Sequence, residues 1–153
     1  MKNKSFIIRN AESKDIESLV RLLEQLFSIE KDFEFNAEHH RRGLTLLLEG
    51  CGKHRAVKVA VCHNEIVGMC TAQTRISTAK GGITAVLEDL VVDSAHRGQG
   101  IGQGLLAEMV RWAQKRGIAH LQLLADQDNS PALTFYRRHE WKPTNLVCLT
   151  RNI

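Results

Sequence analysis

The sequence predicts an α/β protein of the mixed α+β type, in which a central mixed, mostly antiparallel sheet is flanked by helices. Three observations lead to this prediction. Apolar runs of strand length alternate with segments whose apolar residues recur at three- and four-residue steps, as in helices. A glycine-rich turn from Arg97 to Gly104 joins an apolar run to one of the helical segments. No internal repeat, low-complexity stretch or Pro/Ser-rich linker interrupts the 153 residues, so residues 1–153 are expected to form a single domain.

The first third of the chain predicts one strand and two helices. Residues 5–10 have the composition of a short strand. Ser13 is the expected N-cap of a helix over residues 14–27, in which Leu19 and Leu23 belong to an apolar face. Asn36 is expected to cap a second helix over residues 37–48, which ends near Gly50.

The remainder predicts five strands and two helices. The expected strands are residues 56–62, 66–75, 83–92, 121–125 and 146–150. A helix follows the glycine-rich turn and ends at Gly117, and a second begins at Ser130 and Pro131 and extends to about His139. The predicted order is therefore β-α-α-β-β-β-α-β-α-β, with helices on both faces of the sheet.

Composition restricts the class of protein. The N-terminus has only three successive apolar residues, and no run approaches a membrane span, so we expect a soluble, cytoplasmic protein without membrane contact. The four cysteines, Cys51, Cys62, Cys70 and Cys148, lack CxxC spacing, which argues against a zinc site or any other metal centre. The formal charge of +4 suits a phosphate-bearing ligand, but no dense Lys/Arg run supports nucleic-acid binding.

The glycine-rich turn is the most informative motif. A turn of this kind between a strand and a helix presents backbone N–H groups and the positive end of the helix dipole to an anion. A Walker loop would need a lysine after the glycines, and a dinucleotide-binding turn would need glycine at position Gln103 and an acidic residue near position 120. The chain therefore fits neither the Walker pattern nor the dinucleotide-binding pattern. A tight turn with a purely structural role is the alternative.

The pattern that does fit is [Q/R]xxGx[G/A], which here reads Arg97-Gly98-Gln99-Gly100-Ile101-Gly102. Residues 87–93 precede it as an apolar strand with an acidic pair, and Asn129 begins the sequence Asn-Ser-Pro-Ala-Leu-Thr-Phe-Tyr. Together with residues 8–16, these motifs resemble those of the GCN5-related N-acetyltransferase (GNAT) superfamily over essentially the whole chain. The resemblance implies the GNAT fold, acetyl-CoA as cofactor and transfer of its acetyl group to an amine.

The same resemblance implies which residues bind the cofactor. The pyrophosphate is expected on backbone amides of the turn, and the pantetheine arm is expected on backbone groups of the preceding strand and on one asparagine. The implied set is Arg97, Gly98, Gln99, Gly100, Ile101, Gly102 and Gln103 for the pyrophosphate, and Leu90, Val91, Val92 and Asn129 for the arm.

Acetyl transfer to an ammonium group needs a proton acceptor, a group that stabilises the oxyanion and a proton donor for the departing thiolate. Glu88 is the candidate acceptor, directly or through a water, with a structural salt bridge as the alternative role. Strand alternation predicts Glu88, Leu90 and Val92 on one face and Asp89 on the other, so Asp89 is the weaker candidate. Tyr136 is the candidate donor, and its alternative role is an aromatic anchor for the last helix. A backbone N–H near Val92 is expected to bind the oxyanion.

The sequence says less about the amine that accepts the acetyl group. Acidic residues in the segment 29–35 would attract a cationic amine, and the arrangement is most similar to the spermidine/spermine (diamine) acetyltransferase group, which implies that Glu30 and Glu88 hold the amine. An aminoglycoside, an amino acid or a protein N-terminus stays open as acceptor. So does a non-catalytic acyl-CoA-binding regulatory module. Dimers are common in the superfamily, which leaves a homodimer open by analogy alone.

One departure from the family pattern concerns the end of the tyrosine-bearing helix. The family usually has glycine followed by an aromatic residue there, and this chain has Glu140 and Trp141. Glutamate either adopts the left-handed conformation that glycine serves, or the turn differs.

Overall fold

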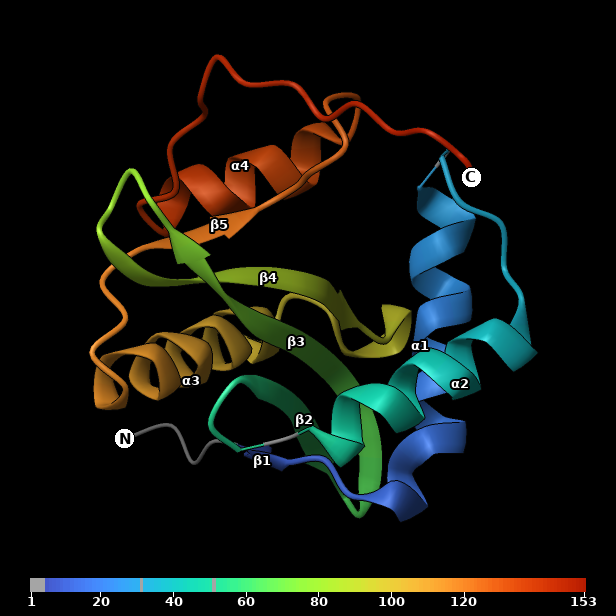
Figure 1. Ribbon diagram of the computed structural model, residues 1–153. Helices are drawn as coiled ribbons and strands as arrows, with labels where there is room; N and C mark the ends of the chain where they lie inside the picture. The colour runs from blue at the N-terminus through green and yellow to red at the C-terminus, as the bar shows by residue number, and fades with distance from the viewer. Residues whose placement is uncertain (1–4, 31, 51) are drawn as a thin grey trace.

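The computed structural model describes residues 5–30, 32–50 and 52–153, and a five-stranded sheet forms its centre (Figure 1). The strands lie in the order β1 (Ile7–Asn10), β2 (Arg55–Cys62), β3 (Glu65–Ser77), β4 (Gly82–Val92) and β5 (Leu121–Leu123). The first four are antiparallel neighbours, and β5 pairs with β4 in parallel. The predicted mixed, mostly antiparallel sheet is confirmed.

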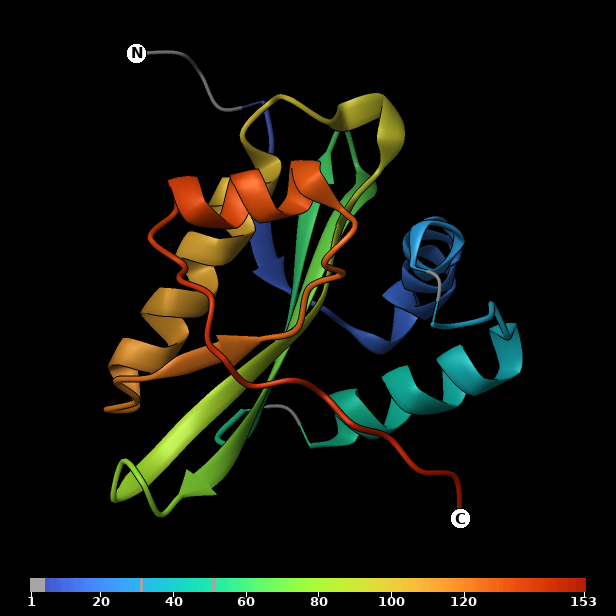
Figure 2. The ribbon, with the colours of Figure 1, turned by 90° about the horizontal axis from the view of Figure 1, so that it is seen from above.

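Four helices cover the two faces of this sheet. Helices α1 (Ile16–Ile29) and α2 (Ala37–Glu49) lie on one side, and α3 (Ile101–Lys115) and α4 (Ser130–Arg138) lie on the other (Figure 2). Each side has its own core. Leu19 of α1 and Leu44 of α2 are buried on the first side, and Leu105 and Met109 of α3 are buried on the second. Among the described residues, no helix is both long enough and apolar enough to cross a bilayer.

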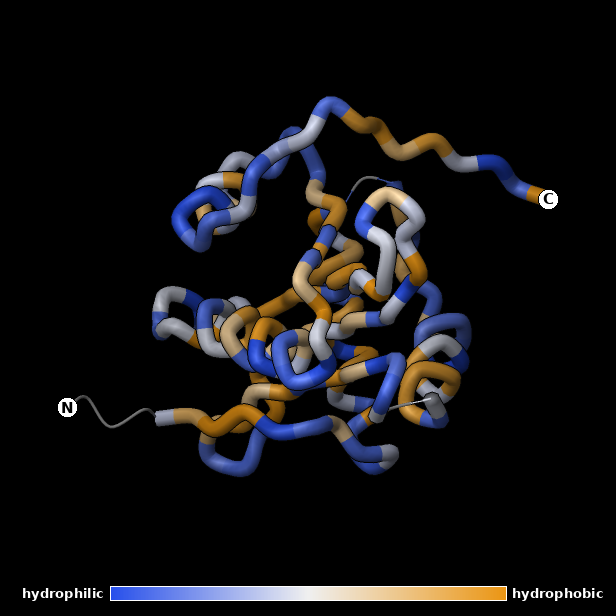
Figure 3. The backbone as a smooth tube through the Cα atoms, turned by 60° about the vertical axis from the view of Figure 1, so that its left-hand side comes forward, coloured by the Kyte–Doolittle hydropathy of each residue, from blue (hydrophilic) through white to orange (hydrophobic). Residues whose placement is uncertain are grey.

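The predicted strand over residues 146–150 does not form. These residues follow α4 as an extended, exposed segment without regular secondary structure, and their apolar side chains lie outside both cores. Figure 3 shows this apolar stretch leaving the body of the protein. An apolar run of strand length indicates a segment that can pair with a strand, but none of the described strands pairs with it here.

Two predicted helix starts are also corrected. The first helix is preceded by a short 3-10 turn, Ser13–Asp15, whose N-cap is Glu12 rather than Ser13. The Glu12 N–H donates to Asp15 Oδ2 at 2.7 Å, and Arg9 donates two hydrogen bonds to the same buried carboxylate, at 2.7 and 3.0 Å. These three bonds lower the pKa of Asp15. Helix α4 is capped by Asn129 in place of Ser130, whereas Asn36 caps α2 as predicted.

The ends of α3 and α4 share one geometry, which settles the turn at Glu140. In α3 the Ile118 N–H donates to the Ala113 carbonyl, and Gly117 has a φ of +66°. In α4 the Trp141 N–H donates to the Tyr136 carbonyl at 3.0 Å, and Glu140 has a φ of +68°. Both are Schellman-type ends, in which a left-handed residue lets the chain reverse and satisfy the last carbonyls. Glu140 therefore adopts the conformation that glycine adopts in α3, at a cost of roughly 1–2 kcal/mol.

Candidate active site

A β-bulge in β4 determines which side chains face the site. Thr71 pairs with Glu88, and Met69 pairs with Val91, so Cys70 of β3 lies opposite two residues of β4. One of those two, Asp89, has a φ of +52°. An extra residue in a strand breaks the alternation of side chains between its two faces.

The bulge corrects the predicted faces of β4. Leu90 and Val92 pack against the core on the α3 side, whereas Val91 belongs to the core under α1 and α2. Glu88 and Asp89 both line a cavity on the α1 and α2 side. Glu88 and Leu90 therefore lie on opposite faces, and the two carboxylates share one face, contrary to the prediction from alternation.

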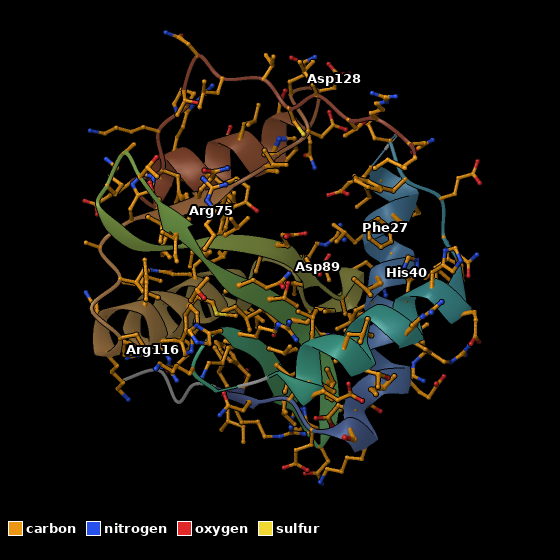
Figure 4. All side chains as sticks on the ribbon, in the orientation of Figure 1. Phe27, His40, Arg75, Asp89, Arg116 and Asp128 are labelled. Atoms are coloured by element: carbon orange, nitrogen blue, oxygen red, sulfur yellow. The ribbon has the colours of Figure 1, made fainter. Side chains whose placement is uncertain are left out.

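The cavity has a volume of about 440 Å3 and lies between helices α1 and α2 and the sheet. Phe27 and His40 line it beside Asp89, which Figure 4 shows on the part of the sheet that these helices face. The Phe27 and His40 rings stack with centroids 4.8 Å apart, and His40 Nε2 accepts the Asn36 N–H at 3.0 Å. Burial lowers the pKa of His40, so the imidazole is neutral and adds no charge to the cavity. The sequence interpretation did not single out either residue, because only the packing of α1 on α2 brings them to the sheet.

Three carboxylates give this region its electrostatic character. Burial raises the pKa of Asp89, and the hydrogen bond from Thr71 Oγ1 at 3.1 Å partly offsets that rise. The pKa of Glu88 is raised by burial and by the charge of Asp89. The pKa of Glu30 is raised by burial first, then by the charges of Asp89, Asp126 and Asp32. Mutual repulsion of this kind is relieved by a bound cation.

Tyr136 extends this group from the other side of the sheet. Its ring packs edge-on against Phe135 and Trp141, with centroids 5.5 and 6.1 Å away. Burial, with smaller contributions from Cys70 and Glu30, raises its pKa to about 12, so the phenol keeps its proton at neutral pH. Within the described chain its hydroxyl has no hydrogen-bond partner. The fold thus brings Glu30, Glu88 and Tyr136 into one region, although Glu30 caps the end of α1 and the other two lie on β4 and α4.

The glycine-rich turn opens α3 with its backbone donors free. Gly98 and Gly100 have φ values of +75° and +81°, and Gly100 is the N-cap residue. The first backbone bond of the helix runs from the Gly104 N–H to the Gly100 carbonyl at 3.0 Å. The N–H groups of residues 101–103 therefore have no acceptor in the described part of the chain, as expected at a helix N-terminus. A Cβ on Gly102 would lie 3.3 Å from the Phe135 ring, which keeps α4 close to this turn.

Asp93 fixes the turn to the rest of the molecule. Its carboxylate accepts hydrogen bonds from Gln25 Nε2 at 2.7 Å and from the Ala95 N–H at 3.2 Å, and it contacts His96 Nδ1 at 2.9 Å. These interactions lower the pKa of Asp93. Gln25 also accepts the Ser94 N–H, so α1 holds the segment between β4 and the glycines in place.

The end of β4 is free on the side of β5. The parallel pairing stops at Leu87 and Leu123, and β4 continues to Val92 while β5 ends (Figure 1). Arg97 Nε donates to the Val92 carbonyl at 3.1 Å across this opening. Asn129 Oδ1 accepts the Ala132 N–H at 3.2 Å, which leaves the amide NH2 without a partner among the described residues.

These features match one known family. The acetyltransferase (GNAT) family model matches residues 18–141. The chain belongs to this family. Streptothricin acetyltransferase from Streptomyces lavendulae is 42% identical to it over 52 residues, which is 34% of this chain and 28% of that protein. The chain thus matches less than a third of that relative's length.

Solved GNAT-like structures cover nearly the whole chain. A transcriptional regulator from Bacillus halodurans C-125 is 28% identical, with a TM-score of 0.82 over 97% of this chain and 99% of that one. A predicted acetyltransferase with acetyl-CoA from Clostridium acetobutylicum is 22% identical and has a TM-score of 0.75 over 95% and 96% of the two chains. The second likeness shows the shared fold.

Gly100→Glu tests whether the turn is the anion site. The new carboxylate would stand at the free N–H groups and repel a phosphate, so we expect CoA to bind at least 100-fold more weakly in a calorimetric titration. Gly81→Glu is the matched control, because Gly81 also has a positive φ, of +68°, and open space around it, but lies between β3 and β4. Equal CoA affinity in the two variants would contradict this assignment.

Proposed function

We propose that the protein transfers the acetyl group of acetyl-CoA to a primary amine of a small cationic molecule, by direct attack in a ternary complex. The carrying observation is that Glu88 and Asp89 both line the cavity under α1 and α2, and that the charge of Asp89 acts on both Glu88 and Glu30. A site with several unneutralised carboxylates favours a cation. The chain as a whole has a formal charge of +4, so the acidic character is local to this site.

The residues on the other side of β4 fit acetyl-CoA. The free N–H groups of Ile101, Gly102 and Gln103, together with the turn at Arg97, Gly98, Gln99 and Gly100, would hold its pyrophosphate. Backbone groups at Leu90, Val91 and Val92, on the edge of β4 that β5 leaves uncovered and where the Val92 carbonyl accepts from Arg97 Nε, would hydrogen-bond to the pantetheine arm as an added strand does. The amide NH2 of Asn129 would donate to the same arm.

Acetyl-CoA, when bound, would supply a thioester whose carbonyl carbon forms a C–N bond with the amine while its C–S bond breaks, so that CoA is the thiolate leaving group. Glu88 takes a proton from the ammonium group, directly or through a water, so that the amine becomes a nucleophile. Its raised pKa makes it a better base than an ordinary glutamate. A backbone N–H near Val92 donates to the carbonyl oxygen as negative charge develops on it. Tyr136 then gives its phenolic proton to the thiolate.

The acceptor class is inferred from two carboxylates that lie on different elements of the site. Glu30 at the end of α1 and Glu88 on β4 offer two anionic positions, which suits an acceptor with at least two cationic groups. A diamine of the spermidine type meets this requirement, as does a small aminoglycoside. We favour the diamine, because a flexible chain with an ammonium group at each end can reach both positions.

Tyr136→Phe tests the proton donor. Phenylalanine keeps the ring contacts with Phe135 and Trp141, so the free energy of unfolding and the affinity for CoA should stay within twofold of wild type. Loss of the phenolic proton should lower kcat by about 100-fold or more, as general acid catalysis typically contributes. Steady-state kinetics with thiol detection measures this. An unchanged kcat would leave Tyr136 only the role of an aromatic anchor.

An amine panel tests the proposed reaction itself. Release of CoA from acetyl-CoA is measured with spermidine, an aminoglycoside, a neutral amino acid and a peptide with a free N-terminus. We expect the highest kcat/KM with the multiply charged small amines and little turnover with the amino acid. Preference for the peptide would contradict the acceptor class. Tight CoA binding without turnover on any amine would overturn the enzyme assignment in favour of an acyl-CoA-binding module.

A further inference from the structure

The cavity under α1 and α2 extends beyond its carboxylates to the start of β2. Glu88 and Asp89 line it on β4, and Arg55 lines it on β2 together with Gln73 on β3. Among the described residues that line the cavity, Arg55 is the only lysine or arginine. The cavity therefore presents a fixed positive charge as well as two carboxylates, and the acetyl-transfer chemistry above uses the carboxylates alone.

Arg55 and Gln73 are cross-strand neighbours with unused hydrogen-bond donors. They lie directly opposite each other in the pairing of β2 with β3, and both line the cavity, so their side chains lie beside each other. Within the described ranges, Arg55 forms no ion pair with a carboxylate and the side-chain amide of Gln73 makes no hydrogen bond. A cation and an amide that face a cavity without partners are groups suited to an anionic or carbonyl oxygen of a ligand.

Helix α2 holds the Arg55 guanidinium in place. Its Nη1 donates to the Leu46 carbonyl at 2.9 Å, which is one of the last four carbonyls of the helix. A side chain on Gly50 would overlap the guanidinium, so this group lies against the backbone at the end of α2. Capping the helix is the alternative role of Arg55, but it uses one N–H and leaves the other donors of the guanidinium available. A cation that is already oriented loses little freedom when it binds a ligand.

We propose that Arg55 and Gln73 bind a carboxylate of the amine acceptor, so that the favoured diamine is a diamino acid such as lysine or ornithine. This inference rests on the proposed function and keeps its requirement for two ammonium groups. The guanidinium fork of Arg55 matches the two oxygens of a carboxylate, and the amide NH2 of Gln73 donates a further hydrogen bond to it. A diamino acid thereby presents its three charges to groups of opposite sign, at Arg55, Glu88 and Glu30.

The position of Arg55 on the sheet agrees with an acceptor of this size. Arg55 lies two strands away from Glu88 and two residues along the sheet, so their Cα atoms are about 12 Å apart. Both side chains reach into the cavity and shorten the gap between the charged groups, which suits a small molecule. The helices add apolar side chains to the same cavity, among them Leu23 and Leu47, and these suit a methylene chain.

Free lysine and cadaverine test the inference, because they differ only in the carboxylate. In wild type, kcat/KM for lysine should exceed that for cadaverine at least tenfold, and Arg55→Gln should lower this ratio at least tenfold, through loss of hydrogen bonds to a charged group. Arg55→Lys keeps the charge and should retain part of the preference. Arg41→Gln is the matched control, since Arg41 lies on α2, pairs with Glu17 and does not line the cavity. Its ratio should equal that of wild type, whereas a merely structural role of Arg55 would move both substrates together.

Calorimetric titration with lysine in the presence of CoA separates this inference from the proposed reaction. Lysine binding that Arg55→Gln weakens at least tenfold, without release of CoA from acetyl-CoA, would support the carboxylate site and contradict the reaction. Turnover of cadaverine at least as efficient as that of lysine would keep the reaction and overturn the inference. So would a lysine-to-cadaverine ratio that Arg55→Gln leaves within twofold of wild type, or the absence of lysine binding.

Discussion

The site depends on one irregularity, the extra residue at Asp89 in β4. Before it, β4 lies between β3 and β5 and is paired on both sides. After it, β4 pairs with β3 alone and its other edge is open. The same residue reverses the faces of the strand, so that Glu88 and Asp89 face the α1 and α2 side while Leu90 and Val92 face the α3 side. A single inserted residue thus separates a region suited to an amine from an edge suited to a cofactor.

The bulge is maintained against a local cost. A left-handed conformation in a residue other than glycine costs roughly 1–2 kcal/mol, although aspartate is among the residues that tolerate it best. The hydrogen bond from Thr71 offsets a cost of this size, since a hydrogen bond to a charged group contributes about 1.5–3 kcal/mol. The surrounding core, with Val91 on one face and Leu90 on the other, holds the strand on either side of the bulge. Strain of this kind concentrates at functional sites, and here it falls at Asp89, next to the proposed proton acceptor Glu88.

The sequence predicted the regular elements well and the irregular ones poorly, for a physical reason. Helical periodicity and glycine spacing report local preferences, and α1 to α4 and β1 to β5 were all predicted from them to within a few residues. The bulge could not be predicted, because strict alternation is the default for a strand and nothing in Leu87-Glu88-Asp89-Leu90 signals an extra residue. Glu88 was therefore grouped with Leu90 and Val92, whereas it shares the face of Asp89 and Val91. The strand at residues 146–150 failed differently, because its composition is strand-like but it pairs with none of the described strands.

The candidate site residues also divide into those that a local motif identifies and those that only the packing of the elements brings together. The glycines and Asn129 could be named from a motif, because they act through local backbone geometry at the ends of α3 and α4. The proximity of Glu30 to Asp89 and Asp126 depends on how the end of α1 packs beside the sheet, and no local pattern encodes it. The roles of Phe27 and His40 in lining the cavity were missed for that reason. Glu140, which departs from the family pattern, adopts the left-handed conformation that the turn requires and so preserves the position of Tyr136.

The most direct test measures how Asp89→Asn changes the KM for the amine and, separately, the dissociation constant of CoA. Asparagine tolerates the left-handed backbone and can still accept the hydrogen bond from Thr71, so the bulge remains and only the charge is lost. Steady-state kinetics should show the KM for spermidine raised at least tenfold, while calorimetry shows the dissociation constant of CoA unchanged. Weakened CoA binding with an unaltered KM for the amine would place Asp89 on the cofactor side and would contradict the account.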